Sequence, residues 1–210
     1  MFDRSFFCLP RIYPITDAHI SGLSHAEQVE RLIVGGAKLI QLREKNASPR
    51  QFYDEARQAL IVARAKGVPL IINDRADIAL ALRADGVHLG QDDLPPLDAR
   101  RLLGRDAIIG LSTHSVEQAI LASAQPVDYI AIGPIFPTRT KDDADRVLGL
   151  EGLPAVRAAV IDTPLVAIGG ISAENLKSVF ESGADSAAII GALLAKPAEI
   201  TSRMKHLTTL

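Results

Sequence analysis

The feature that most constrains this chain is a series of eight short apolar runs, each followed by a longer segment. The runs are rich in isoleucine, valine and leucine and are almost continuously apolar, which is typical of parallel strands covered on both faces. Regular alternation of such runs with helical segments predicts a parallel sheet with helices packed on it. The runs occupy residues 11–16, 38–43, 69–73, 85–89, 107–112, 128–133, 164–169 and 185–190.

The segments between the runs carry helical periodicity and helix boundary signals. Several begin with serine or proline, and some end with glycine, as helices commonly do. Eight repeats without a linker or a shift in composition favour one (β/α)8 TIM barrel over residues 1–210, at the short end of about 200 to 400 residues. An open doubly wound sheet is the alternative, because alternation alone does not establish closure. The expected helices cover 24–36, 48–67, 75–84, 95–104, 115–124, 150–160, 172–183 and a segment from about Pro197.

The composition narrows the class of protein. A formal net charge of -2 over 210 residues offers no basic surface for nucleic acid or membranes. No stretch approaches the roughly 18 apolar residues of a membrane span, and the first residues lack the pattern of a secretory signal. The single cysteine, Cys8, favours a reducing compartment. We therefore expect a cytoplasmic protein that acts on small molecules, and a homo-oligomer is compatible with this reading.

In a TIM barrel the active site forms at the carboxyl ends of the strands. At the end of the run 38–43, Gln41, Arg43 and Lys45 alternate along the chain, so their side chains can share one face. A forked guanidinium and a compact ammonium together suit a polyanion such as diphosphate. The alternative is an ordinary solvated loop, since most charged loop residues are simply exposed.

Carboxylates follow the next two strands. Asp74 follows Asn73 at the end of one run, and Asp92 and Asp93 follow the run that contains His88. Carboxylates from neighbouring strand ends can converge on Mg²⁺, which takes one or two protein carboxylates and completes its shell with water and substrate phosphates. The alternative is that Asp74 and Asp93 cap the helices that follow them. His88 itself is expected to be an inward-facing, hydrogen-bonded core histidine.

The remaining strand ends carry hydroxyls, one cation and glycines. Ser112 lacks the surroundings of a nucleophile and is interpreted as a hydrogen-bonding residue. The loop after 128–133 is longer than a connection needs and contains Thr138, Thr140 and Lys141. Glycines let backbone N–H groups approach an anion. Such barrels often bind a phosphate after strands seven and eight, where this chain has Gly169, Gly170 and Gly191.

These strand ends together predict two anion sites. The first is a metal-assisted diphosphate site at strands two to four, and the second is a monophosphate site at strands seven and eight. A diphosphate held by cations is a leaving group, so substitution at the carbon that it leaves is the indicated reaction. The sequence contains no evident nucleophile triad, which favours positioning and electrostatic stabilisation over covalent catalysis.

An ordered set of motifs carries a family resemblance. The segments "YPITD", "QLREK", "NDRADIAL", "GVHLGQDDLP", "IGLSTHS", "DYIAIGPIFPTRTK" and "VAIGGIS" resemble those of thiamine-phosphate synthases, from about Tyr13 to Ala192. The resemblance implies a (β/α)8 barrel that joins hydroxymethylpyrimidine diphosphate to a thiazole phosphate. The family's reaction is dissociative: diphosphate departs first, the ring stabilises the methylene cation, and the thiazole nitrogen captures it.

The resemblance also implies roles for individual residues. Asp74 and Asp93 would be the Mg²⁺ ligands, and Arg43, Lys45, Ser112 and Lys141 would be the catalytic residues. One departure concerns Gly191, where the family usually has a serine, so a hydroxyl contact to the thiazole phosphate would be lost. The expected substrate-binding residues are Gln41, Leu42, Arg43, Glu44, Lys45, Asn73, Ser112, Thr138, Thr140, Lys141, Gly170, Ile190 and Gly191.

Two other functions fit part of this pattern. A thiazole tautomerase is an isomerase on a similar barrel that binds the thiazole phosphate without coupling it. Such an enzyme would not need the cations of 41–45 or the pair Asp74 and Asp93. A non-catalytic barrel that binds thiazole phosphate is the alternative from a different class, and the polar residues at five strand ends argue against it.

Overall fold

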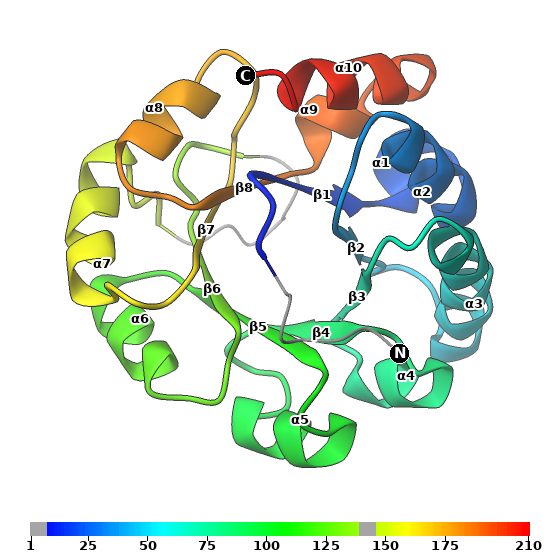
Figure 1. The fold of residues 1–210 in the computed structure, drawn as a ribbon, viewed down its shortest axis with the longest axis horizontal. Coiled ribbons are helices and arrows are strands. Elements are labelled where there is room, and N and C mark those ends of the chain that lie inside the picture. Colours follow the sequence, from blue (N-terminus) through cyan, green and yellow to red (C-terminus); the bar gives the residue numbers. More distant parts are fainter. Residues whose placement is uncertain (1–7, 139–145) are drawn as a thin grey trace.

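The computed structural model describes residues 8–138 and 146–210. Its eight parallel strands pair in sequence order and close into a barrel, with β8 hydrogen-bonded to β1 in the register Ile12 to Ala187. Figure 1 shows the strands as a central ring with the helices outside it. The predicted TIM barrel is confirmed and the open sheet is excluded. The strands are β1 (Ile12–Thr16), β2 (Ile40–Leu42), β3 (Leu70–Asn73), β4 (Gly86–Leu89), β5 (Ile108–Thr113), β6 (Tyr129–Ile132), β7 (Leu165–Ile168) and β8 (Ser186–Ile189).

The predicted helices are present, and two very short ones were not predicted. Ser24 and Ser48 each form a capping box with the residue three positions later, which satisfies backbone N–H groups at the helix start. The two additional helices are single turns, too short to produce a periodic pattern. The helices are α1 (Ala18–Ser21), α2 (His25–Val34), α3 (Pro49–Ala65), α4 (Ala76–Leu82), α5 (Pro96–Leu103), α6 (Val116–Ser123), α7 (Leu153–Ala159), α8 (Leu176–Glu181), α9 (Gly191–Leu194) and α10 (Ile200–Leu207), with 3₁₀ turns η2 (Leu150–Gly152) and η3 (Pro197–Glu199).

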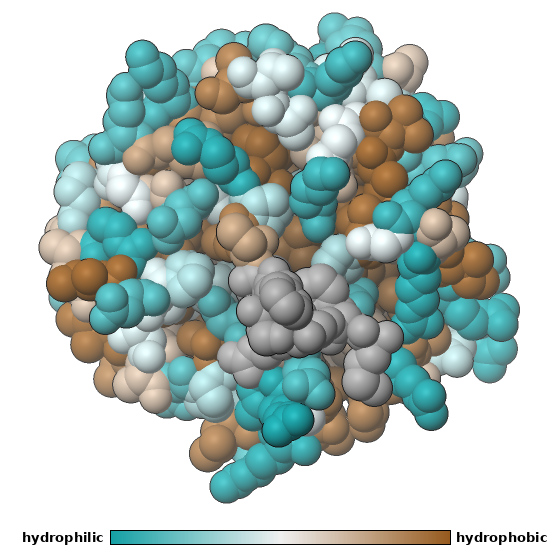
Figure 2. Space-filling view, in the orientation of Figure 1, coloured by the Kyte–Doolittle hydropathy of each residue, from teal (hydrophilic) through white to brown (hydrophobic). Residues whose placement is uncertain are grey.

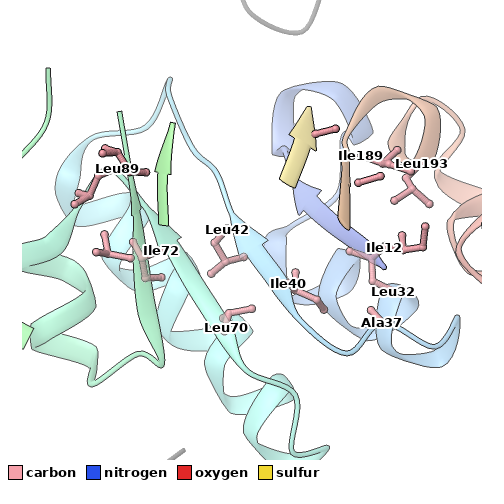
Figure 3. Packing of buried hydrophobic residues seen from close by; sticks show 14 of the residues in the cluster. Ile12, Leu32, Ala37, Ile40, Leu42, Leu70, Ile72, Leu89, Ile189 and Leu193 are labelled. Carbon is pink, nitrogen blue, oxygen red and sulfur yellow. The ribbon is translucent and has the colours of Figure 1, made fainter. Parts of the chain in front are cut away.

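The hydrophobic core has two layers, one on each side of the barrel wall. Leu70 and Ile72 of β3 face the helices, where Figure 3 shows such side chains packed together. Ile71, between them, faces the barrel interior and belongs to a second cluster. Because alternate residues of a strand point to opposite faces, both faces are apolar and the strands read as continuous apolar runs.

Three aspartates brace the amino-terminal end of the barrel. Each lies directly before an even-numbered strand and accepts a hydrogen bond from a backbone N–H of the preceding strand. Two of them also pair with an arginine, at 2.7 Å for Asp128 and 2.8 Å for Asp185. The backbone bonds run from Leu70 to Asp85, from Ile109 to Asp128 and from Leu165 to Asp185. These structural contacts lie at the end opposite to the carboxyl ends of the strands, where catalytic residues of this fold collect.

The face seen in Figure 2 carries hydrophilic and hydrophobic side chains side by side over the surrounding helices. Within residues 8–138 and 146–210, no helix has both the length and the apolarity that a membrane crossing would require.

Candidate active site

A cavity of about 660 Å³ opens at the carboxyl ends of the strands. Its floor is apolar, with Ile15, Ile168 and Ala188 beneath a polar rim. Most of the residues singled out from the sequence line this cavity, as the position rule for barrels predicts. They are Gln41, Arg43, Lys45, Asn73, Asp74, Asp93, Ser112, Thr138, Gly170, Ile190 and Gly191.

Four of the predicted site residues are not in this group. Leu42 is fully buried between the barrel and the helices, because it alternates with Gln41 and Arg43. Glu44 faces away as well, and its Oε1 accepts hydrogen bonds from the backbone N–H groups of Asn46 and Ala47. Neither side chain lines the cavity. Thr140 and Lys141 lie outside the described residues.

The two cations of the rim are each held by a carboxylate. Arg43 Nη1 lies 2.6 Å from Oδ2 of Asp17, and both side chains are largely buried. Lys45 Nζ lies 2.5 Å from Oδ2 of Asp74, with half of the lysine side chain exposed. Each carboxylate therefore holds its cation at the cavity. Lys45 and Asp74 form the more exposed pair, so an entering anion can take the place of Asp74 beside Lys45.

Asp74 takes an uncommon backbone conformation for a residue with a side chain. Its φ is 62°, in the left-handed region that asparagine and aspartate tolerate better than other residues. The backbone N–H of Asp74 donates to the carbonyl oxygen of His88 at 2.8 Å. Helix α4 begins after Arg75 without a side-chain cap, so the capping alternative for Asp74 is wrong. Arg75 itself pairs with Asp77.

Asp93 likewise has a role other than capping. Its Oδ2 accepts a hydrogen bond from the backbone N–H of Gly90 at 2.7 Å, and α5 begins after Pro95 without a side-chain cap. Burial, with a smaller contribution from the negative charge of Asp74, raises the pKa of the Asp93 carboxyl. The carboxylate of Asp74, at the neighbouring strand end, therefore lies close enough to disfavour the charged form of Asp93.

This electrostatic arrangement fits a divalent cation. Among the described residues that line the cavity, two are cationic and three are acidic, namely Arg43, Lys45, Asp74, Asp92 and Asp93. The negative charge of a diphosphate would be repelled by this excess of carboxylates unless a bound cation compensated for their charge. The described residues contain no cluster of three or more metal-ligating side chains. Mg²⁺ does not require one, since it commonly takes one or two protein carboxylates.

His88 connects the rim to the barrel interior. Its Nε2 lies 2.8 Å from Ser112 Oγ, and its Nδ1 lies 3.0 Å from the hydroxyl of Tyr129. Burial lowers the pKa of His88 to about 4, so the ring is neutral near pH 7. The expectation of an inward-facing, hydrogen-bonded histidine is confirmed, and the ring also lines the cavity.

The glycines after β7 allow a neighbouring loop to approach. Gly169 and Gly170 have φ of 100° and 65°, which residues with a side chain rarely adopt. A Cβ on Gly170 would lie 2.7 Å from Cβ of Phe136 and equally close to the carbonyl oxygen of Pro137. The turn therefore needs glycine to pack against the loop after β6, while its backbone borders the cavity.

Several cavity residues were missed in the sequence. Gln91 Nε2 donates to the carbonyl oxygen of Ser112 at 2.5 Å, and His114 Nδ1 lies 2.7 Å from the carbonyl oxygen of Gly133. Gln118 also lines the cavity. Asp17, the partner of Arg43, could have been predicted from the sequence. It directly follows the first strand, at the same end of the barrel as the other polar residues.

The comparison with known families agrees with this geometry. The family described as thiamine monophosphate synthase matches residues 12–193. The chain belongs to this family. A thiamine-phosphate synthase from Chloroflexus aurantiacus is 47% identical over 201 residues, which cover 95% of this chain and 92% of that protein. A second one, from Syntrophomonas wolfei, is 50% identical over 184 residues, covering 87% and 88%.

A solved structure within the same family has the same architecture. The thiamine phosphate pyrophosphorylase from Pyrococcus furiosus superimposes with a TM-score of 0.85 at 36% identity, covering 95% of this chain and 94% of that one. A 3-hexulose-6-phosphate synthase, at 17% identity and a TM-score of 0.68, shares the fold alone. The thiamine monophosphate synthase family is therefore supported by sequence and by structure over nearly the whole chain.

Proposed function

We propose that this protein is a transferase that joins 4-amino-2-methyl-5-hydroxymethylpyrimidine diphosphate to a thiazole phosphate, giving thiamine phosphate and diphosphate. The observation that carries the proposal is the cavity rim, where Arg43, Lys45 and the pair Asp74 and Asp93 come together. A diphosphate with its cation needs such a set, whereas a barrel that only binds or isomerises a thiazole phosphate does not. Family membership supports the same activity.

The first step breaks the carbon–oxygen bond between the pyrimidine methylene and the diphosphate. The bonding electron pair leaves with the diphosphate, whose growing negative charge is stabilised by the guanidinium of Arg43 and the ammonium of Lys45. The methylene carbon is left cationic, and the electron-rich aminopyrimidine ring delocalises its charge. Ser112, near the end of β5, would donate a hydrogen bond to the pyrimidine diphosphate. Thr140 and Lys141 lie outside the described residues; we propose that Lys141 contacts the pyrimidine diphosphate and that Thr140 contacts the thiazole phosphate.

Mg²⁺ would be held by Asp74 and Asp93. When bound, it would neutralise charge on the diphosphate oxygens, as in other sites that combine one or two carboxylates with substrate phosphates. The protein's own part is to keep the two carboxylates at adjacent strand ends. The backbone N–H of Gly90 and the left-handed turn at Asp74 do this.

The second step forms a bond between the thiazole nitrogen and the methylene carbon. The nitrogen lone pair supplies the electrons, so the step needs no general base. The thiazole phosphate would bind at the ends of β6, β7 and β8, at Thr138, Gly170, Ile190 and Gly191, which line the cavity. This would put the nucleophile on the opposite side of the cavity from the diphosphate, above the apolar side chains of Ile15, Ile168 and Ala188.

A coupled assay tests the proposed function. Purified protein with Mg²⁺ and both substrates should produce thiamine phosphate, and the assay is run with the ordinary thiazole phosphate and with its carboxylated form. Absence of product at every Mg²⁺ concentration would refute the synthase. Interconversion of thiazole isomers without coupling would instead identify a tautomerase. A double variant, Arg43→Ala with Lys45→Ala, controls for activity carried by a contaminating enzyme.

We also propose that the protein works in the cytoplasm. Its exposed free thiol at Cys8 is stable in a reducing compartment. A homo-oligomer is compatible with this proposal, as it is with the sequence.

A further inference from the structure

A chain of hydrogen bonds runs through the barrel interior and joins two cavity residues, Gln41 of β2 and Ser112 of β5. Gln41 Nε2 donates to the Tyr13 hydroxyl at 3.2 Å, and the two tyrosine hydroxyls lie 2.9 Å apart. The Tyr129 hydroxyl lies 3.0 Å from His88 Nδ1, and His88 Nε2 lies 2.8 Å from Ser112 Oγ. The tyrosines are 1% and 0% exposed, so water does not reach them.

The sequence makes room for this chain at one glycine. Gly110 lies in the middle of β5, beside Tyr129 in β6. A Cβ at Gly110 would lie 2.1 Å from Cζ and 2.4 Å from the hydroxyl oxygen of Tyr129. A glycine weakens a strand, and here it leaves the space that the ring of Tyr129 occupies. The two tyrosine rings meet edge to face, with centroids 5.8 Å apart.

The donors and acceptors of the chain can be assigned from one end. The nitrogen of the Gln41 amide only donates, so the Tyr13 oxygen accepts from it. The Tyr13 proton then points to the Tyr129 oxygen, and the Tyr129 proton points to His88 Nδ1. A ring nitrogen that accepts carries no proton, so the proton of neutral His88 is on Nε2.

The reverse direction leaves a buried proton without an acceptor. If Nδ1 of His88 carried the proton, the Tyr129 oxygen would accept it and the Tyr129 proton would point to Tyr13. The Tyr13 oxygen would then accept two hydrogen bonds, and its own hydroxyl proton would have no acceptor in this series of hydrogen bonds. A buried donor without a partner costs about 1–3 kcal/mol, so the first direction is favoured.

We propose that Tyr13 and Tyr129 are positioning residues for the reaction. The direction of their hydrogen bonds determines whether Gln41 and Ser112 offer a donor or an acceptor to the cavity. His88 Nε2 donates to Ser112 Oγ, so the Ser112 proton is free to donate to the ligand. The Tyr13 oxygen accepts a hydrogen bond from Nε2 of Gln41, so the side-chain carbonyl oxygen of Gln41 is left to accept a hydrogen bond from the ligand. The cavity therefore offers one acceptor and one donor in fixed places.

This pattern matches the pyrimidine half of the proposed reaction, and that match rests on the proposed function. An exocyclic amino group of the pyrimidine donates and suits the Gln41 oxygen. A ring nitrogen or a diphosphate oxygen accepts and suits the Ser112 hydroxyl. Neither tyrosine is among the residues that line the cavity, so neither would touch the substrate directly. Their effect reaches it through the amide of Gln41 and through His88 with Ser112.

The tautomer of His88 tests the chain without any substrate. The protein is labelled with ¹⁵N-histidine, and the two ring nitrogens of His88 are assigned by NMR against a His88→Gln variant. We expect a protonated Nε2 and an unprotonated Nδ1 in the wild type, with a mixture of tautomers in Tyr129→Phe. A proton on Nδ1 in the wild-type protein would overturn the proposal.

Kinetics of matched phenylalanine variants test the consequence for the reaction. Tyr129→Phe and Tyr13→Phe each remove one hydroxyl of the chain, whereas Tyr53→Phe removes a hydroxyl on α3, away from the cavity, and serves as the control. The loss of one hydrogen bond corresponds to a roughly tenfold decrease in a rate constant. We expect kcat/KM for the pyrimidine diphosphate to fall by about that factor in both chain variants. The KM for the thiazole phosphate should stay within about twofold, since a general loss of packing would affect both substrates alike.

The outcomes separate this proposal from the proposed function. Kinetics of Tyr129→Phe and Tyr13→Phe that equal those of Tyr53→Phe would overturn the positioning role. If the wild-type protein makes no thiamine phosphate, the proposed function fails, and the tautomer of His88 still decides whether the chain has the stated direction. If one chain variant does not fold, the other variant and the wild-type tautomer provide the decision.

Discussion

Nζ of Lys45 lies 2.5 Å from Oδ2 of Asp74, which joins the cation that follows β2 to the carboxylate that follows β3. Lys45 is half exposed, so its ammonium is accessible to an entering anion. The pair thus brings together the two components of a diphosphate site, a cation for the phosphate oxygens and a carboxylate for Mg²⁺.

Replacing Lys45 by alanine should impair the diphosphate half of the reaction selectively. A hydrogen bond between charged groups contributes about 1.5–3 kcal/mol, so kcat/KM for the pyrimidine diphosphate should fall roughly 10- to 100-fold. The KM for the thiazole phosphate should change little. Steady-state kinetics with each substrate varied in turn measure the difference. Lys196→Ala removes a lysine from an exposed pair with Glu199 and is the control. Equal losses for both substrates would contradict the division into two sites.

Replacing Asp93 by asparagine should raise the Mg²⁺ concentration that the reaction needs. The amide keeps the size of the side chain and can still accept the hydrogen bond from Gly90, but it loses the charge. We expect an increase of about tenfold or more in the concentration for half-maximal rate, as for other changes at metal sites. Asp98→Asn, at an exposed pair with Arg101, is the control. Full activity of the wild-type enzyme after treatment with a strong chelator would refute the metal assignment altogether.

Replacing Gly191 by serine should improve binding of the thiazole phosphate. Gly191 is the first residue of α9, so its backbone is helical and accepts a side chain without strain. A new hydroxyl contact to a phosphate corresponds to a decrease of roughly 3- to 10-fold in KM. The KM for the pyrimidine diphosphate is the internal control and should not change. An unchanged or higher KM for the thiazole phosphate would contradict the expectation.

The stability of the protein should depend on pH through His88. Its pKa is lowered by burial from 6.5 to about 4, so the unfolded chain binds a proton on this residue between these two pH values and the folded chain does not. Stability should therefore fall as the pH decreases through this window, by up to about 3 kcal/mol from this one residue. Urea unfolding at several pH values measures it.

Two histidine variants isolate that contribution. His88→Gln removes the titrating group, so the free energy of unfolding should decline less steeply between pH 6.5 and pH 4 than in the wild-type protein. His206→Gln, at an exposed position on α10, should leave the decline unchanged. Identical curves for His88→Gln and the wild type would show that burial of His88 does not govern this part of the pH dependence.

The amino-acid sequence by itself determined the order of strands and helices and the end of the barrel at which the site forms. Short, almost continuously apolar runs that alternate with helical segments are typical of parallel strands with both faces covered, and polar residues directly after such strands gather at one edge of the sheet. Gln41, Arg43 and Lys45 were placed correctly by the alternation of side chains in an extended chain. The same alternation, applied to Leu42 and Glu44, indicates that their side chains face away, as the structure has them.

Only the tertiary structure decided how distant residues meet. Closure of the barrel depends on the pairing of β1 with β8, and no local pattern encodes the register between the two ends of a chain. The contacts between Arg43 and Asp17 and between Tyr13 and Tyr129 arise for the same reason. Strands that are far apart in sequence point their inner side chains at a common axis, and which of those side chains touch depends on the stagger and the residue volumes in all eight strands together.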